Sequence, residues 1–154
     1  MTRLNRSCAR RLLGQPPPFW KNREMTDAWK VAAEEILGEL QAKVTARDLA
    51  GLLEFFEDPA VLIGTAGDGR TSDSRREYLT AVTTQPAAVG WLWHETALFY
   101  ESEDALGFAA FGDVVLTDAT AEFRAPIRAT FLAVRVDGGW RLRQFHGSTP
   151  QAPT

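Results

Sequence analysis

Cysteine is almost absent from this sequence, with one residue, Cys8, among 154. A lone cysteine cannot form an intrachain disulfide, which is the pattern expected in a reducing cytoplasm. The chain also lacks the run of roughly 18 apolar residues that a membrane-spanning helix requires. Only Leu12 and Leu13 follow Arg10 and Arg11, too few apolar residues for a signal peptide. We therefore expect a cytoplasmic protein without a membrane segment.

Histidine is scarce as well, with two residues in the chain. One of them, His146, has no cysteine, aspartate or glutamate at a spacing typical of metal ligands, which argues against a metal site. The glycine-rich stretch 67–70 lacks the lysine and the spacing of a phosphate-binding loop, and we interpret it as a turn. The sequence thus predicts neither a bound metal nor a cofactor.

Positive charge is concentrated in one short segment. Residues 1–24 carry six basic groups and one acidic group, whereas the remaining 130 residues carry 11 basic and 19 acidic groups, a net charge of −8. An acidic body repels the phosphates of nucleic acids. We therefore expect no nucleic-acid binding by the main part of the chain.

Three consecutive prolines, Pro16–Pro18, separate the basic leader from that acidic body. Prolines remove backbone donors and favour extended geometry, so residues 1–24 are predicted to be a disordered leader or an upstream misreading, with Met25 as the true start. A leader that is ordered on the body is the alternative. The length and the 45% hydrophobic content suit one core, which we place in a single domain over 25–150, with 151–154 as a tail.

The first half of this domain has helical periodicity. Apolar residues recur at spacings of three and four from Trp29 to Val44, which predicts a long amphipathic helix. A second short helix is expected from about Ala46 to Phe56, before a short buried strand over 61–64. Ser72 or Asp73 can cap a third helix. In that helix three residues face inward: Tyr78, Leu79 and Val82.

Beyond Pro86 the pattern changes to long runs of aromatic and β-branched residues, which are typical of strands. Polar turns separate these runs, and Asp137-Gly138-Gly139 is a strong hairpin signal. Helices that precede an antiparallel meander predict the α+β fold class. The four expected strands cover 89–101, 105–116, 121–136 and 140–148.

The last of these strands carry the motifs that identify a family. An arginine and a threonine occur in Arg128-Ala129-Thr130, a glycine turn precedes the pair Trp140-Arg141, and the run His146-Gly147-Ser148-Thr149-Pro150 closes the domain. This order resembles the end of SnoaL-like proteins, within the nuclear transport factor 2-like superfamily, and the association domain of calcium/calmodulin-dependent kinase ends similarly. Ile63-Gly64-Thr65 and Asp48-Leu49-Ala50-Gly51-Leu52 also look like the family.

The resemblance covers roughly residues 25–150, and it implies a cone-shaped α+β fold with helices on a curved sheet. It further implies that the open end of the cone can hold a small molecule, and that the outer sheet face forms a homodimer. The superfamily contains cyclases, isomerases, dehydratases, hydrolases and proteins without known activity, so it does not by itself assign a reaction.

Three polar residues are candidates for chemistry. Because imidazole titrates near neutral pH, His146 is a candidate general base or ligand-binding donor, on a strand face shared with Trp140, Leu142, Gln144 and Ser148. The alternative is that His146 and Ser148 hold the end of the sheet through backbone hydrogen bonds. Asp48 is the second acid-base candidate, by its place in the family, or else it stabilises the start of a helix. Arg128 would bind a carboxylate if it faced inward, or a helix acid otherwise.

Aromatic residues are the candidates for a pocket wall. Strict alternation places Trp91, Trp93, Glu95 and Phe99 on one face of a strand and the residues between them on the other. One face packs on helices, and the other is apolar enough to suggest a dimer interface or a pocket. The candidate ligand-binding aromatics are Trp91, Trp93, Phe111, Phe131 and Trp140.

Three functions follow from these observations. The first is a dimeric protein that binds a small acid or carbonyl compound. The second is a lyase, isomerase or cyclase in which His146 or Asp48 moves a proton beside a carbonyl and Arg128 stabilises the oxyanion. The third is a structural module for dimerisation or assembly.

Overall fold

The helical part of the chain follows the apolar periodicity of its sequence. The computed structural model describes residues 27–65 and 67–151. The predicted leader 1–24, Met25 and residues 152–154 lie outside these ranges. The first five elements are α1 (Ala28–Thr45), α2 (Leu49–Phe55), β1 (Phe56–Ile63), β2 (Asp68–Gly69) and α3 (Ser72–Thr84).

Four long strands follow, and each agrees within one residue with the range predicted from its aromatic and β-branched content. The turn before the last strand is the one that the sequence indicates, because Asp137 and Gly138 both adopt a positive φ, of 50° and 82°. The strands are β3 (Ala88–Glu101), β4 (Ala105–Thr117), β5 (Glu122–Val136) and β6 (Gly139–Ser148).

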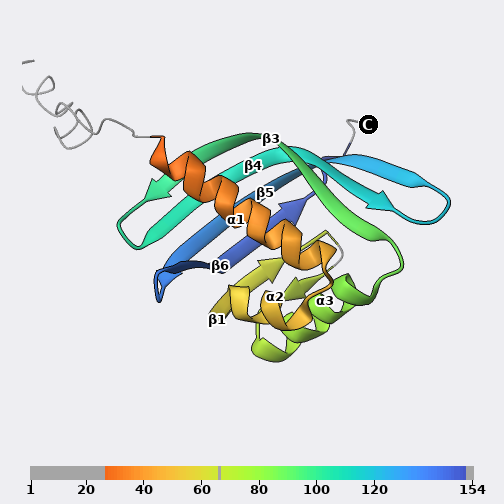
Figure 1. The fold of residues 1–154 in the computed structure, drawn as a ribbon, viewed down its shortest axis with the longest axis horizontal. Helices are drawn as coiled ribbons and strands as arrows, with labels where there is room; N and C mark the ends of the chain where they lie inside the picture. Colours follow the sequence, from red (N-terminus) through yellow and green to blue (C-terminus); the bar gives the residue numbers. More distant parts are fainter. Residues whose placement is uncertain (1–26, 66, 152–154) are drawn as a thin grey trace, which may run out of the picture.

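The six strands form one mixed sheet in the order β2-β1-β6-β5-β4-β3. Strands β3 to β6 are an antiparallel meander, and β1 joins it parallel to β6. Figure 1 shows α1 lying across one face of the curved sheet, with α2 and α3 beside β1. Three helices on a curved sheet confirm the predicted α+β fold class. We call the face under α1 the inner face and the opposite one the outer face.

The core lies between α1 and the inner face. Phe131 is fully buried; its ring stacks on Phe108 at a centroid distance of 4.9 Å and meets Phe145 edge-on at 5.3 Å. Burying one such side chain contributes roughly 1.5–3 kcal/mol. The predicted apolar face of α1 supplies the other side of this core through Trp29, Ala33, Ile36, Leu37, Leu40 and Val44.

β-bulges in β6 and in β3 change which side chains face inward. In β6, Leu142 pairs with Ala133 and Gln144 with Leu132, so Arg143 is an extra residue. An extra residue reverses the alternation of faces. Leu142 and Phe145 therefore both face inward. His146 lies on the outer face with Gln144 and Ser148, as predicted, but not with Trp140 and Leu142, and that part of the prediction is wrong.

The same correction applies to β3. Trp93 pairs with Gly112 and Glu95 with Phe111, so His94 is the extra residue there. Trp91 and Trp93 face inward, as a pair, but Glu95 lies on the outer face beside Phe111. A second register shift, between Leu98 and Tyr100, makes Phe99 an extra residue as well. The predicted grouping of Glu95 and Phe99 with the two tryptophans therefore does not hold.

Smaller differences concern the segment between α2 and α3. Strand β1 begins at Phe56, earlier than the predicted 61–64, and β2 pairs with its end. The prediction that this strand is buried holds for Leu62 but is wrong for Val61 and Ile63, which are each 39% exposed. Helix α3 is capped by Thr71 rather than by Ser72 or Asp73, because the Thr71 and Ser74 side chains each bond to the other residue's backbone N–H. No helix within the described residues is long and apolar enough to cross a membrane.

Candidate functional site

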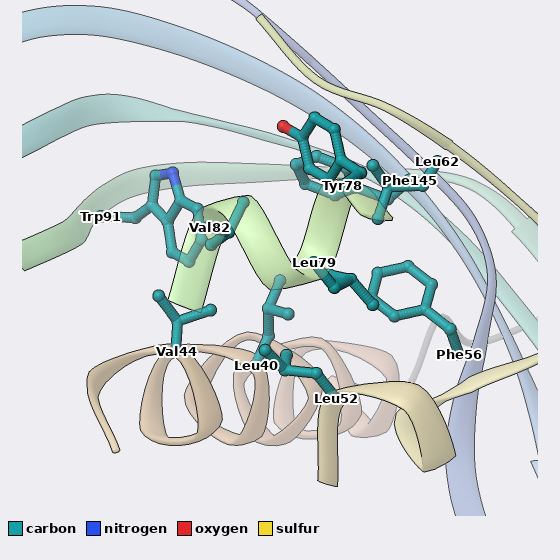
Figure 2. A pocket seen from close by; sticks show the side chains of 10 residues that line it. All are labelled: Leu40, Val44, Leu52, Phe56, Leu62, Tyr78, Leu79, Val82, Trp91 and Phe145. Carbon is teal, nitrogen blue, oxygen red and sulfur yellow. The ribbon is translucent and has the colours of Figure 1, made fainter. Parts of the chain in front are cut away.

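A small cavity lies between the helices and the inner face of the sheet (Figure 2). Its interior volume is about 50 Å³, and about 350 Å³ when the space open to solvent at its mouth is included. An interior of this size is smaller than the roughly 150 Å³ that encloses benzene in an engineered cavity. A ligand would therefore extend into the mouth. The lining residues are Leu40, Val44, Leu52, Phe56, Leu62, Tyr78, Leu79, Val82, Trp91 and Phe145.

The lining is apolar except for two groups, the Tyr78 hydroxyl and the Trp91 indole N–H. In Figure 2 both polar atoms lie on the side of the cavity away from α1, while Leu40, Val44 and Leu52 form the opposite side. Among the lining residues none is charged at neutral pH. The cavity can thus hold an apolar body, with the two polar groups at its edge.

Tyr78 is the titratable group of this lining. It projects from α3, and burial raises the pKa of its hydroxyl above the usual value of 10.0. Desolvation has this effect because it disfavours the phenolate. The hydroxyl is therefore a neutral donor and acceptor at physiological pH.

Helix α3, which carries Tyr78, is fastened near both ends. Near its start, the buried Arg75 donates from Nη1 to the carbonyl oxygen of Ala60 at 2.7 Å and from Nη2 to Asp58 at 2.9 Å. At its C-terminal end, Arg47 donates from Nη1 to the carbonyl oxygens of Thr83 and Gln85, at 3.0 and 2.7 Å. These bonds satisfy carbonyl groups that have no backbone partner at the end of a helix and in a strand. They link α3 to β1 and to the segment before α2, and so fix its position over the cavity.

The two acid-base candidates lie away from the cavity. His146 is exposed on the outer face, opposite Thr130 and Ile63. Asp48 is the N-cap of α2, where its carboxylate accepts a hydrogen bond from the Gly51 N–H at 2.9 Å. The helix-start role that the sequence left open for Asp48 is the one that the structure shows.

Arg128 and Phe111 both lie on the outer face, where they pair directly across β4 and β5. Arg128 is exposed, and its Nε lies 3.3 Å from the Ser148 hydroxyl. Its guanidinium is thus on the opposite side of the sheet from the cavity. A carboxylate clamp by Arg128 would act at the outer face.

Of the remaining aromatics, Trp91 is the one that lines the cavity. Trp93 stacks on Trp91 at a centroid distance of 6.3 Å and contacts Phe131 edge-on at 6.1 Å. Trp93 and Phe131 therefore pack next to the cavity wall without lining it. Trp140 lies near the β5–β6 turn, where the Arg135 guanidinium is 4.2 Å from its ring centroid. The structure therefore brings together Trp91, Trp93 and Phe131, and leaves Trp140 apart.

Nine of the ten lining residues were not named as site candidates, although apolar periodicity predicted burial for several of them, among them Leu40 and Val44 on the first helix. Tyr78, Leu79 and Val82 were predicted to face inward on the third helix. Inward-facing periodicity does not distinguish a cavity wall from packed core, because both bury apolar side chains. No cluster of three or more histidine, cysteine, aspartate or glutamate side chains suited to a metal occurs within 27–65 and 67–151.

The outer face carries an exposed apolar patch. We define the outer patch as Leu92, Phe99, Tyr100 and Phe111, which are 43%, 59%, 51% and 42% exposed. Asp113, next to the patch, contacts two basic side chains. Its Oδ2 lies 3.2 Å from His94 Nε2 and 3.9 Å from Arg124 Nε. The patch and its charged margin are the second candidate site.

Comparison with known proteins supports the family that the closing motifs indicate. The sequence pattern of the SnoaL-like domain matches residues 33–152. The described part of this range includes the cavity and the outer patch. No curated protein matches the chain in sequence.

Several solved structures share the fold at low sequence identity. A protein from Streptomyces avermitilis, provisionally named a dehydratase of the NTF2-like family, is 10% identical, with a TM-score of 0.71 over 82% of this chain and 100% of that one. A provisional aromatic ring hydroxylase from Novosphingobium aromaticivorans is 14% identical, with a TM-score of 0.69 over 82% and 92%. A provisional kinase II association domain from Xanthomonas campestris is 16% identical, with a TM-score of 0.67 over 79% and 85%. Identities this low establish the fold alone.

Proposed function

Since the chain belongs to the SnoaL-like domain family, we propose that it binds a small neutral molecule in the cavity under α1. The observation that carries this proposal is the lining itself, which is apolar apart from two hydrogen-bonding groups on one side. Ligand sites combine apolar walls with a few placed polar groups in this way.

The lining favours a neutral ligand over an acid. A bound carboxylate needs a cation or several donors when it leaves water. Arg128 and His146 are on the outer face, and the lining residues carry no positive charge. A small ketone, or a compound with one hydroxyl group, meets the donors present without a buried charge.

Binding is also better supported than proton transfer. The lyase, isomerase or cyclase hypothesis requires an acid-base group in reach of the ligand. His146 is exposed on the outer face and Asp48 caps α2. Among the described lining residues Tyr78 is the titratable side chain. Burial raises the pKa of its hydroxyl, so the phenol keeps its proton at neutral pH and cannot act as a general base. We therefore propose a binding protein first.

A matched pair of valine substitutions tests the site. Val82→Phe fills the cavity wall, whereas Val31→Phe adds the same bulk at a position of α1 that is 65% exposed. Thermal unfolding is followed with small neutral ketones and with carboxylates of the same size. A ligand at a hundred times its Kd stabilises by about 2.7 kcal/mol, which raises Tm by several degrees.

The expected result is a concentration-dependent rise in Tm with ketones for the wild type and Val31→Phe, and none for Val82→Phe. Carboxylates should give a smaller rise because the lining offers no cation. A rise that persists in Val82→Phe would mean that the ligand binds elsewhere. A response confined to carboxylates would contradict a neutral ligand.

A second function is favoured by the outer patch, namely pairing of two copies of this chain. A two-fold interface must be complementary to itself. The patch is compatible with this condition, since its margin holds both the acidic Glu95 and Asp113 and the basic Arg124 and Arg128 on neighbouring strands. Exposed apolar surface of this kind marks interaction sites. We propose that two copies of the chain pair through the outer face, and that each copy binds its ligand in its own cavity.

A further inference from the structure

The position of the Tyr78 ring depends on a glycine. The main-chain N–H of Gly64, just after β1, donates to the carbonyl oxygen of Gly67 at 2.8 Å. A methyl group on Gly64 would overlap the Tyr78 hydroxyl oxygen and would lie 2.6 Å from ring carbon Cζ. On Gly67 a methyl group would still have room, at 3.5 Å from Tyr78 Cδ2. The absent side chain of Gly64 therefore creates the space that the hydroxyl occupies.

The glycine and the helix together hold the phenol from two sides. The hydrogen bonds of Arg75 and Arg47 fix the position of α3 near its two ends. The backbone of Gly64 lies directly against the Tyr78 hydroxyl. A polar group that is positioned before the ligand arrives costs little further ordering on binding. The Tyr78 hydroxyl is thus a preorganised group at the edge of an apolar cavity.

We propose that the Tyr78 hydroxyl, positioned by Gly64, is the group that selects the ligand, by donating a hydrogen bond to a ketone or similar neutral carbonyl oxygen. This inference rests on the proposed function and specifies its ligand class. The apolar floor of Leu40, Val44 and Leu52 holds the hydrocarbon part, while the oxygen lies toward Tyr78 (Figure 2).

Burial supports the donor role. It raises the pKa of the Tyr78 hydroxyl, so that the proton stays on the oxygen at neutral pH. A phenol at the edge of a weakly polar site discriminates between an oxygen and a methylene group of the same shape, because the wrong ligand leaves the hydroxyl without its partner.

Two probes of equal size separate hydrogen bonding from filling of the cavity. Cyclopentanone and methylenecyclopentane differ by replacement of the carbonyl oxygen with a methylene group. Their dissociation constants are measured by NMR titration of the isotope-labelled full chain, for the wild type and for Tyr78→Phe. We expect the wild type to bind the ketone about three- to tenfold more tightly, the range of one net hydrogen bond, and Tyr78→Phe to bind both probes equally.

A pair of glycine substitutions tests the positioning role. Gly64→Ala should shift the Tyr78 ring and weaken ketone binding at least as much as Tyr78→Phe does. Gly38→Ala, on α1 with no neighbour within 4 Å of the added methyl group, is the matched control and should bind both probes like the wild type. The amide spectrum of each variant shows whether it is folded, and Tyr78→Phe decides the selection role even if Gly64→Ala does not fold.

The outcomes distinguish this inference from the function beneath it. If the wild type binds both probes with equal affinity, the cavity is a binding site but Tyr78 does not select its ligand. A ketone preference that survives in Tyr78→Phe overturns the inference as well, and would direct attention to the Trp91 N–H. Binding of neither probe overturns both the proposed function and the role of Tyr78.

Discussion

The side chain of Gln41 on α1 closes the edge of the sheet beside Trp91. Its Oε1 accepts a hydrogen bond from the Trp91 main-chain N–H at 2.8 Å, and its Nε2 donates to the Val89 carbonyl oxygen at 3.1 Å. Because β3 is an edge strand, these groups would otherwise lack a ladder partner. Gln41 thereby fastens α1 to the strand that forms the cavity wall.

Replacement of Gln41 by alanine should therefore lower stability. Two partly buried main-chain groups lose their partner, and each costs on the order of 1 kcal/mol. Urea unfolding should show a decrease of about 1–2 kcal/mol. Gln144→Ala, which removes a 3.3 Å contact with Thr130 on the outer face, serves as the control and should cost about 0.5 kcal/mol or less. Equal losses in the two variants would show that the bonds of Gln41 have no special weight.

Arg75 offers a comparison between a buried and an exposed arginine, each paired with an aspartate at the surface. It is 4% exposed and bonds to both Asp58 and the Ala60 carbonyl, whereas Arg70 pairs with Asp68 at the surface. We expect Arg75→Ala to lower the free energy of unfolding by about 2–3 kcal/mol, because it leaves a buried carbonyl unpartnered and removes packing. Arg70→Ala should cost less than about 1 kcal/mol. Similar midpoints in urea for both variants would contradict this ranking.

The sequence predicts the helices and strands well because each of them repeats one period over many residues. The spacing of Trp29 to Val44 matches α1, and the four long strands follow their aromatic runs. An element of one period or less has no repeat from which it can be predicted. Strand β2 has two residues, and its pairing with β1 depends on how α3 closes over it, not on the composition of the loop.

The candidate site was less predictable for a different physical reason. An extra residue reverses the faces of the strand that follows it, as Arg143 does in β6 and His94 and Phe99 each do in β3, and none of the three signals a bulge. Strict alternation therefore placed His146 with Leu142, although Phe145 faces inward in its place. Tyr78 was predicted to face inward, yet the space in front of it depends on Gly64, which lies in another segment.

Asp48 distinguishes a helix cap from a catalytic acid. Its carboxylate bonds to the Gly51 N–H, so Asp48→Ala should lower stability by about 1 kcal/mol, while Asp48→Asn should retain most of it. Neither variant should alter ligand affinity at the cavity. Loss of binding in the stable Asp48→Asn variant would restore Asp48 as a functional acid.

The outer patch gives a prediction about mass in solution. Phe111 lies at its centre, between Glu95 and Arg128 on the flanking strands. Phe111→Glu places a charge in the apolar contact and should convert the dimer into a monomer, as measured by light scattering. Val31→Glu on α1 is the control and should remain dimeric. A wild type that is monomeric at high concentration would rule out the interface.

Tyr78 also predicts a pH dependence. Burial raises its pKa above 10.0 in the folded chain, so above that pH the unfolded state loses its proton first. The free energy of unfolding should then fall as the pH rises beyond about 10, by up to ~1.4 kcal/mol per pH unit from this group. The fall should be smaller in Tyr78→Phe and unchanged in Tyr100→Phe, whose side chain is exposed. Identical pH profiles in all three proteins would mean that Tyr78 is solvated.

The most direct measurement of the central claim is an NMR titration of the labelled chain with cyclopentanone, observed at the side chains themselves. We predict that the NMR signals of the methyl groups of Leu40, Val44 and Val82 and of the indole N–H of Trp91 shift together and saturate with one Kd. The signals of the outer patch should stay unchanged. Shifts that centre on the outer patch, or none at the cavity, would contradict the claim that the space under α1 is a ligand site.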